Sequence, residues 1–229
     1  MNFTPPLPVN AVMIDLDGTL LDTIPDLAAA ANGMLTELNM PVLPEATIRN
    51  YVGKGIANLI ERTLTNSMDG KPDAELFQRA VPVYERTYRE VNGKYTTMYP
   101  GVKEGLDLLR AQGYPLACVT NKSERFTLPL LDYVNLSSYF VSVVAGDTLP
   151  QKKPDPEPLL HACKQMKVAP HEMLMIGDSL NDAQAARSAG CPVFCVTYGY
   201  NEGHDVQTLD VDAIVASLVE ATALITKKN

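Results

Sequence analysis

The sequence contains no long apolar run. No apolar stretch approaches the roughly 18 residues that a helix needs to cross a membrane. The first nine residues include three prolines and no Lys or Arg, which is unlike a secretory signal peptide. We therefore expect a cytoplasmic protein without a membrane partner.

Cysteines are few, and their spacing is not that of a zinc site. The chain has 4 of them, and no pair of C-x2-C motifs occurs. We expect ordinary buried thiols in a reducing compartment at Cys118, Cys163, Cys191 and Cys195. A nucleotide-binding P-loop is also missing, because Gly53-Lys54-Gly55 lacks the required spacing.

Basic residues are outnumbered by acidic ones. There are 19 Lys and Arg against 27 Asp and Glu, a formal net charge of −8. A negative protein repels nucleic acid, so we expect no nucleic-acid partner. The same charge repels anionic substrates, so a phosphate-binding site must concentrate positive charge locally.

From residue 101 onward, predicted helices alternate with short apolar strands. Strands are expected at 115–119, 140–145, 173–176 and 193–196, and helices at 101–112, 126–133, 156–166, 182–189 and 213–225. Such alternation is typical of an α/β fold with a Rossmann-like parallel sheet and helices on both faces. Ligands of open parallel sheets bind at the carboxyl ends of the strands.

The segment after the first strand breaks this alternation. Between residues 25 and 98 it shows helical patterns at 27–38, 47–51, 56–66 and 74–90, and no clear strand. It is too long for a connection and long enough for its own small core. We predict a helical domain at 25–95, inserted into an α/β core formed by 1–24 and 96–229.

The first cluster of chemically suggestive residues follows the apolar run Val12–Ile14. Asp15 and Asp17 are one residue apart, and regular strand geometry would put both side chains on the same face. One carboxylate can attack phosphorus and the other can transfer protons. Gly18 permits an abrupt turn that aims backbone N–H groups at an anion, and Thr19 follows it.

Three further clusters follow later strands. Thr120 and Asn121 can bind a phosphoryl oxygen or simply form a turn. Lys153 can neutralise a phosphoryl group or be a solvated loop lysine. Asp178 can complete an oxygen-rich cation site, while Asp182 four residues later can instead cap the next helix.

These four clusters, in this order, resemble the haloacid dehalogenase superfamily and its phosphatase branch. The resemblance covers Val12 to about Ala189 and implies an inserted helical cap over the sheet. It implies that Asp15 is the nucleophile and Asp17 the general acid and base. Thr120 and Lys153 would hold the phosphoryl group, with Gly18, Thr19 and Asn121 also contacting substrate.

The resemblance also implies a Mg²⁺ site. Asp15 and Asp178 would bind the metal by carboxylate oxygens and Asp17 by its main-chain carbonyl, with Ser179 and Asp182 supporting these ligands from outside. Mn²⁺ stays an alternative, since both ions prefer oxygen ligands. In the inserted segment, Arg49 and Lys54 are candidates for binding the non-reacting end of the substrate.

Three longer matches refine the expected activity. They resemble bacterial phosphoglycolate phosphatases and lie at Lys152–Pro156, Gly177–Asp182 and Thr197–Asn201. They imply a small phosphorylated metabolite as partner and hydrolysis of 2-phosphoglycolate through an aspartyl phosphate. A sugar-phosphate phosphatase, a β-phosphoglucomutase-like transferase and a catalytically idle binding protein are alternatives. Both a monomer and a homodimer are compatible with the sequence.

Overall fold

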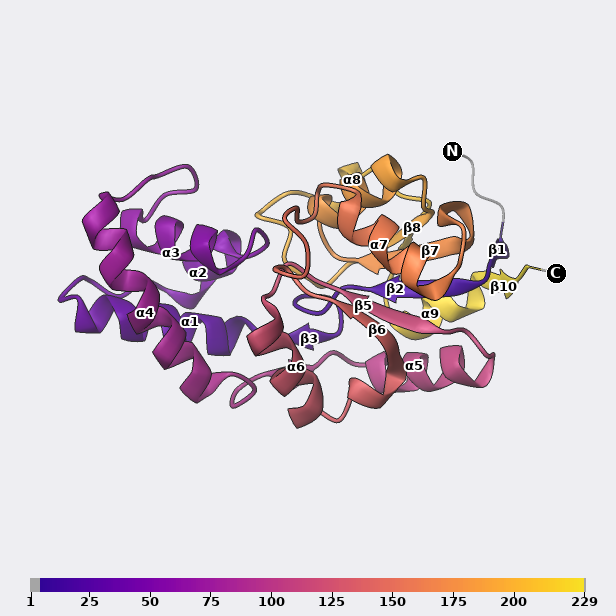
Figure 1. The fold of residues 1–229 in the computed structure, drawn as a ribbon, viewed down its shortest axis with the longest axis horizontal. Coiled ribbons are helices and arrows are strands. Elements are labelled where there is room, and N and C mark those ends of the chain that lie inside the picture. Colours follow the sequence, from indigo (N-terminus) through magenta and orange to yellow (C-terminus); the bar gives the residue numbers. More distant parts are fainter. Residues whose placement is uncertain (1–4, 229) are drawn as a thin grey trace.

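A parallel β-sheet forms the centre of the molecule (Figure 1). The computed structural model describes residues 5–228. Within them, neighbouring strands of this sheet are all parallel. The sheet order is β6 (Phe140–Val144), β5 (Leu116–Val119), β2 (Ala11–Ile14), β7 (Met173–Gly177), β8 (Val193–Val196) and β9 (Ala213–Val215). The predicted α/β fold with a parallel sheet is confirmed.

Helices cover both faces of the sheet (Figure 1). Along β2, Val12 and Ile14 pack toward one layer, whereas Ala11 and Met13 pack toward the other. Because both faces are buried, this strand is a continuous apolar run rather than an alternating one. The first layer contains α5 (Val102–Ala111), α6 (Glu124–Tyr133) and α9 (Leu218–Ala223), and the second contains α7 (Glu157–Met166) and α8 (Leu180–Ala189).

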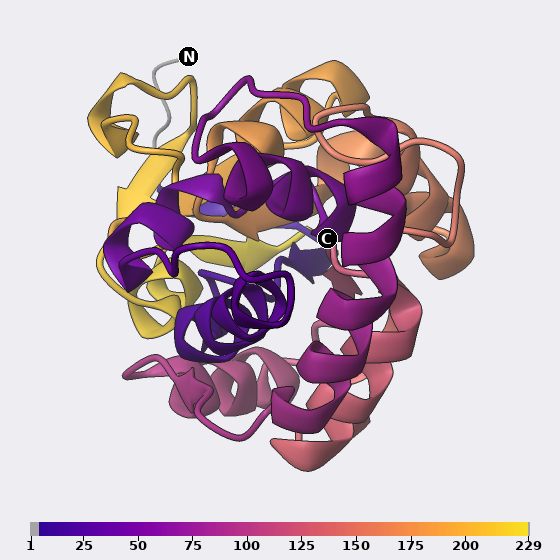
Figure 2. The ribbon, with the colours of Figure 1, turned by 90° about the vertical axis from the view of Figure 1, so that its left-hand side faces the viewer.

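A group of helices, here called the helical lobe (residues 24–91), lies beyond one end of the sheet, on the left of Figure 1 and facing the viewer in Figure 2. Its apolar side chains form a separate core. Tyr84 and Tyr88 are fully buried in it, and Phe126 of α6 packs against Tyr88 with ring centroids 4.7 Å apart. The lobe consists of α1 (Ile24–Glu37), α2 (Glu45–Tyr51), α3 (Ile56–Thr65) and α4 (Ala74–Val91).

Two short connections join the helical lobe to the sheet. β3 (Leu21–Asp22) enters the lobe, β4 (Thr97–Met98) leaves it, and the two form an antiparallel pair. Asp26, fully buried in the first turn of α1, ties them together. Its carboxylate accepts hydrogen bonds from Gly93 N at 2.7 Å, Tyr95 N at 2.7 Å and Thr96 Oγ1 at 2.5 Å.

Part of the predicted secondary structure is wrong. Residues 213–225 form β9, α9 and β10 (Ile225–Lys227) rather than one helix. Residues 213–215 extend beside β8, and the helix begins only after Ser217, whose hydroxyl accepts a hydrogen bond from Glu220 N. The strand at 97–98 was not expected, nor was β1 (Leu7–Val9), which pairs with β10. Tertiary pairing decides the structure of such short segments.

The cysteines match the expectation from the sequence. All four cysteines are free and buried, as predicted. No helix within residues 5–228 has both the length and the apolar character required to cross a membrane.

The contacts of Asp26 predict that it stabilises the fold. In Asp26→Ala, the buried N–H of Gly93 loses its acceptor, and two further donors lose theirs. The free energy of unfolding in urea is expected to fall by about 3 kcal/mol. Exposed Asp69 serves as the control, and Asp69→Ala is expected to change the value by less than about 0.5 kcal/mol. Equal effects of the two substitutions would contradict this role.

Candidate active site

Three adjacent strands of the sheet deliver polar residues to one place. Asp15 follows β2, Thr120 follows β5 and Asp178 follows β7, and β2 lies between the other two strands. Carboxyl ends of parallel strands meet at one edge, so these side chains converge there. The structure thus brings the predicted strand-end residues together.

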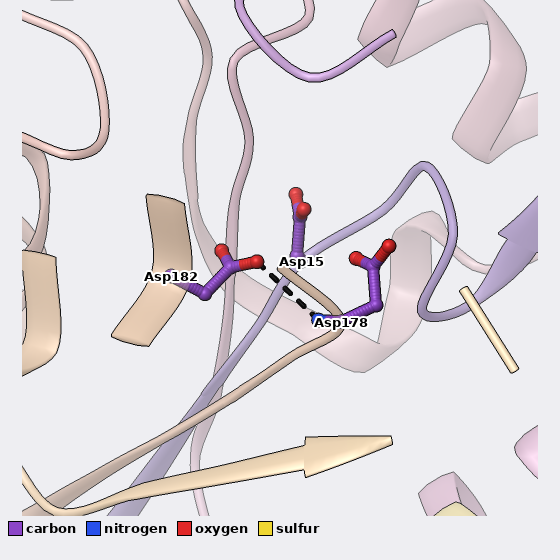
Figure 3. A group of neighbouring side chains, drawn as sticks. All are labelled: Asp15, Asp178 and Asp182. Atoms are coloured by element: carbon purple, nitrogen blue, oxygen red, sulfur yellow. Dashed lines mark hydrogen bonds between the residues drawn. The ribbon is translucent and has the colours of Figure 1, made fainter. Parts of the chain in front are cut away.

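A cluster of buried carboxylates stands at this edge (Figure 3). Oxygens of Asp15, Asp178 and Asp182 all lie within 4.8 Å of one another. In Figure 3 the carboxylates of Asp15 and Asp178 point to the same side, whereas Asp182 is hydrogen-bonded to the backbone of Asp178. All three residues are buried, so water does not screen their repulsion.

Asp178 is held by the backbone and side chains around it. Its Oδ1 accepts from Thr19 Oγ1 at 2.9 Å, and its Oδ2 accepts from Tyr200 N at 2.6 Å. Gly18 has a φ of 90°, and a Cβ at this position would lie 2.3 Å from Asp178 Oδ2. Glycine is therefore required there both for its backbone conformation and for space.

Asp182 combines helix capping with support of the cluster. Ser179 and Asp182 form a capping box at the start of α8, in which Asp182 Oδ2 accepts from Ser179 N at 3.1 Å. The same oxygen accepts from Ser179 Oγ at 2.8 Å, and Oδ1 accepts from Lys153 Nζ at 2.7 Å. Both of its oxygens are thus engaged by the protein.

Lys153 supplies the positive charge within the cluster. Its buried Nζ lies 3.0 Å from Asp15 Oδ1 and 2.7 Å from Asp182 Oδ1, and donates to Val119 O at 2.7 Å. Asn121 positions this residue, because its Oδ1 accepts from Lys153 N and its Nδ2 donates to Lys153 O. Burial acts to lower the pKa of Lys153, but the charges of Asp15 and Asp182 outweigh it and raise that pKa.

The carboxylates carry more negative charge than Lys153 balances. Burial, together with the charge of Asp182, raises the pKa of Asp15 to about 7 despite the opposing effect of Lys153. Burial and the charges of Asp182 and Asp15 raise the pKa of Asp178 well above its usual range. Three carboxylates and one ammonium group leave a formal charge of −3 + 1 = −2.

This donor set fits a divalent cation that prefers oxygen ligands. Asp15 Oδ1 accepts from Leu16 N at 2.8 Å and faces Lys153, whereas Asp15 Oδ2 accepts no hydrogen bond within the described chain. Asp178 has one hydrogen bond on each oxygen, which leaves lone pairs for a metal. Asp15 and Asp178 are therefore better placed than Asp182 to bind a cation directly.

Asp17 lies in the same loop but faces other partners. β2 ends at Ile14, so Asp15 and Asp17 follow loop geometry instead of the expected strand geometry. Asp17 Oδ1 accepts from Thr23 Oγ1 at 2.8 Å, and both of its oxygens lie 3.1 Å from Lys122 Nζ. Lys122 also donates to Tyr88 Oη of the helical lobe.

A pocket lies between the helical lobe and the carboxyl edge of the sheet. Its wall on the lobe side is mainly apolar, and its floor is polar. The lobe contributes Leu27, Val52, Gly53, Gly55, Ile56 and Leu59, and the rest of the chain contributes Asp15, Asp17, Thr120, Asn121, Lys122, Lys153, Asp178, Ser179, Asn181 and Tyr200.

Other predicted substrate contacts lie outside the pocket lining. The structure places Thr19 beside Asp178, and Gly18 N donates to Leu21 O at 2.8 Å instead of facing an anion. Arg49 lies 3.5 Å from Asp22 Oδ2, and Lys54 lies 3.6 Å from Glu202 Oε2.

Three polar residues of the pocket floor were not among the predicted site residues: Lys122, Asn181 and Tyr200. Lys122 directly follows the predicted pair Thr120 and Asn121, so its position after a strand was a usable signal. Tyr200 lies within the Thr197–Asn201 match, but its contacts could not be predicted, because its hydroxyl hydrogen-bonds with Thr23 N and Leu21 O, far away in the sequence.

Comparisons with known proteins give consistent matches. The family model described as haloacid dehalogenase-like hydrolase matches residues 12–196. The phosphoglycolate phosphatase of Nitrosospira multiformis is 63% identical, covering 98% of this chain and 99% of that protein. That of Thiobacillus denitrificans is 54% identical, with coverages of 97% and 98%.

Among solved structures, a predicted phosphoglycolate phosphatase from Haemophilus somnus is similar. Its TM-score is 0.88 and its sequence identity 33%, and the match covers 93% of this chain and 96% of that one. The arrangement of helical lobe and sheet thus has a close experimental counterpart.

The raised pKa of Asp15 predicts how metal-free stability depends on pH. The unfolded carboxyl ionises near 3.8 and the folded one near 7, so folding takes up a proton between these values. The free energy of unfolding contributed by this group is therefore expected to fall as the pH rises across that range. Chemical denaturation with a chelator present measures it. Asp15→Asn should remove this part of the decline, and an unchanged pH dependence in that variant would contradict the assignment.

The same carboxyl predicts that Mg²⁺ competes with a proton. Below pH 7, affinity for Mg²⁺ is expected to rise by at least about tenfold per pH unit, because Asp15 loses a proton as the metal binds and Asp178 also has a raised pKa. Calorimetric titration at about pH 5.5 and about pH 8 measures this dependence. Equal affinities at the two pH values would show that the metal displaces no proton.

Proposed function

The chain belongs to the haloacid dehalogenase-like hydrolase family, and on this premise we propose that it is a cytoplasmic, Mg²⁺-dependent phosphatase of 2-phosphoglycolate. The predicted family resemblance is confirmed by the match over residues 12–196. One structural observation carries the chemistry: Asp15 Oδ2 is free of hydrogen bonds within the described chain, while Lys153 holds Oδ1 at 3.0 Å. A carboxylate so oriented suits attack on a phosphoryl group.

The first step forms an aspartyl phosphate. An oxygen of Asp15 attacks phosphorus, and the bond between phosphorus and the ester oxygen breaks. Asp17 gives its proton to the departing oxygen, so that glycolate leaves as an alcohol rather than an alkoxide. Thr23 and Lys122 fix the side chain of Asp17 beside the pocket during this transfer.

The second step releases phosphate. Asp17, now ionised, accepts a proton from water as the water oxygen attacks phosphorus. The bond between phosphorus and Asp15 breaks, which restores both carboxyl groups and yields inorganic phosphate. Using one residue as acid and then as base returns the site to its starting state.

The remaining residues offset charge on the phosphoryl group. Lys153 already contacts Asp15 and is placed to contact the phosphoryl oxygens, beside the hydroxyl of Thr120. Asp15, Asp178 and the main-chain carbonyl of Asp17 would hold Mg²⁺. When bound, the metal neutralises negative charge on the phosphoryl oxygens.

The helical lobe serves as a cap in this proposal. We assign 25–95 to the cap domain and 1–24 with 96–229 to the catalytic core. Gly53 O accepts from Asn121 Nδ2 at 2.9 Å and from Asn181 Nδ2 at 3.4 Å, so the lobe touches the polar floor directly. Breaking these contacts together with others between lobe and core, such as the ion pair of Arg62 with Glu202 at 3.0 Å, would open the pocket to substrate, and re-forming them would exclude water.

The role of Asp15 predicts that its substitution stops the reaction. Asp15→Asn keeps the size of the side chain but removes the nucleophilic charge, so kcat is expected to fall by at least about 1,000-fold. Phosphate release measures it, with circular dichroism to check folding. Asp147→Asn is the matched control, because Asp147 also follows a strand but is exposed. Substantial turnover by Asp15→Asn would exclude the mechanism.

The proposed substrate predicts the result of a phosphoester panel. With Mg²⁺, kcat/KM is expected to be highest for 2-phosphoglycolate, and a chelator should abolish release. Mn²⁺ in place of Mg²⁺ tests the choice of metal. A preference for a hexose phosphate would retain the phosphatase class and replace the substrate, whereas isomerisation of a hexose phosphate without net phosphate release would indicate a transferase.

A further inference from the structure

Lys122 occupies the side of the pocket where the leaving group must lie. In the proposed function, Asp17 donates its proton to the ester oxygen, so this oxygen sits beside the Asp17 carboxylate. Lys122 Nζ is 3.1 Å from each oxygen of that carboxylate and lines the same pocket. The ammonium group is therefore a near neighbour of the first atoms of the leaving group.

Lys122 is also the cationic residue of the pocket whose charge is available to the leaving group. Of the described residues that line the pocket, two are cationic, Lys122 and Lys153. Lys153 is shared between Asp15 and Asp182, next to the carboxylate that attacks phosphorus in the proposed function. The amide of Asn121 is already used by Gly53 and Lys153.

The hydrogen bonds of Lys122 leave it able to take another partner. An ammonium group has three N–H donors, and charge-assisted hydrogen bonds are typically about 2.7–2.9 Å long. Both contacts with Asp17 measure 3.1 Å, so two donors share one carboxylate in a loose arrangement. If Lys122 donates one hydrogen bond to a single Asp17 oxygen and a second to Tyr88 Oη, its third N–H donor is free for substrate.

The dimensions of 2-phosphoglycolate match this free donor. Its carboxylate is attached to the carbon that bears the ester oxygen, so the carboxylate oxygens lie roughly 3 Å from the ester oxygen. An ester oxygen hydrogen-bonded to Asp17 therefore places a carboxylate within reach of Lys122. The side chain of Lys122 is only 2% exposed, so this ion pair would be little screened by water.

We infer that Lys122 is the residue that selects phosphomonoesters with a carboxylate on the ester-bearing carbon. This inference rests on the proposed function. Tyr88 supports the role from the helical lobe: its hydroxyl accepts a hydrogen bond from the ammonium group, whose Nζ lies 4.9 Å from the ring centroid. Closure of the lobe thus completes the recognition of the carboxylate.

The test compares 2-phosphoglycolate with ethyl phosphate, in which a methyl group replaces the carboxylate. The measured quantity is the ratio of the two kcat/KM values. In Lys122→Met this ratio is expected to fall by at least about 30-fold, because the substrate carboxylate loses its buried counter-charge. Lys122→Arg keeps the charge and is expected to retain more of the ratio than Lys122→Met. The control is Lys152→Met, whose side chain is exposed and outside the pocket lining, and it should keep the wild-type ratio.

The outcomes separate this role from others. Equal losses on both substrates in Lys122→Met would leave the ratio unchanged and mean that Lys122 only positions Asp17. That result would overturn the inference, as would no loss on either substrate. If Lys122→Met fails to fold, Tyr88→Phe replaces it: the ring stays, the hydroxyl contact is lost, and the ratio should fall by about threefold or more. No fall in that variant would also overturn the inference. A wild-type protein that releases phosphate from neither ester would instead refute the proposed function.

Discussion

The repulsion among buried carboxylates at the carboxyl edge of the sheet is the constraint on which the rest of the structure depends. Asp15 and Asp178 retain free lone pairs, whereas Asp182 is fully hydrogen-bonded. Packing such charges together in a low-dielectric place is costly unless counter-charge is supplied. Lys153 supplies one positive charge, and a divalent cation would supply two. Thr19, the backbone of Tyr200 and the capping box of α8 hold the carboxylates in this unfavourable arrangement.

The sequence predicts the sheet and its carboxyl-edge residues well because buried parallel strands are continuous apolar runs. Ala11–Ile14 and Met173–Gly177 are examples, and each is followed by the expected aspartate. The two-residue strands Leu21–Asp22 and Thr97–Met98 were out of reach, since only their mutual pairing defines them. The same holds for the 213–227 region, where contact with β8 and β1 decides which residues extend.

The site residues also divide into those that the local sequence indicates and those that depend on distant contacts. Asp15, Thr120 and Asp178 follow strands, so their positions could be predicted from the sequence, but their roles were implied only by the four clusters taken together. Lys122 could be seen in the sequence but not interpreted, because its partners Asp17 and Tyr88 lie 105 and 34 residues away. Among the described residues that line the pocket there are two ammonium groups, Lys153 beside Asp15 and Lys122 beside Asp17. In the proposed function, the first would face the site of attack at phosphorus and the second the departing alcohol.

In the proposed function the helical lobe opens and closes over the pocket, and the paired connections at Leu21–Asp22 and Thr97–Met98 limit how far it can move. Two strands anchored side by side, with Asp26 bridging them, act as a short double tether. A lobe that has swung away stays within a small volume of the sheet, so Tyr88 faces Lys122 at a high effective concentration. Closure is therefore a unimolecular event whose rate does not depend on protein concentration. The contacts between lobe and core, such as those of Gly53 O and the ion pair of Arg62 with Glu202, would then re-form within one molecule.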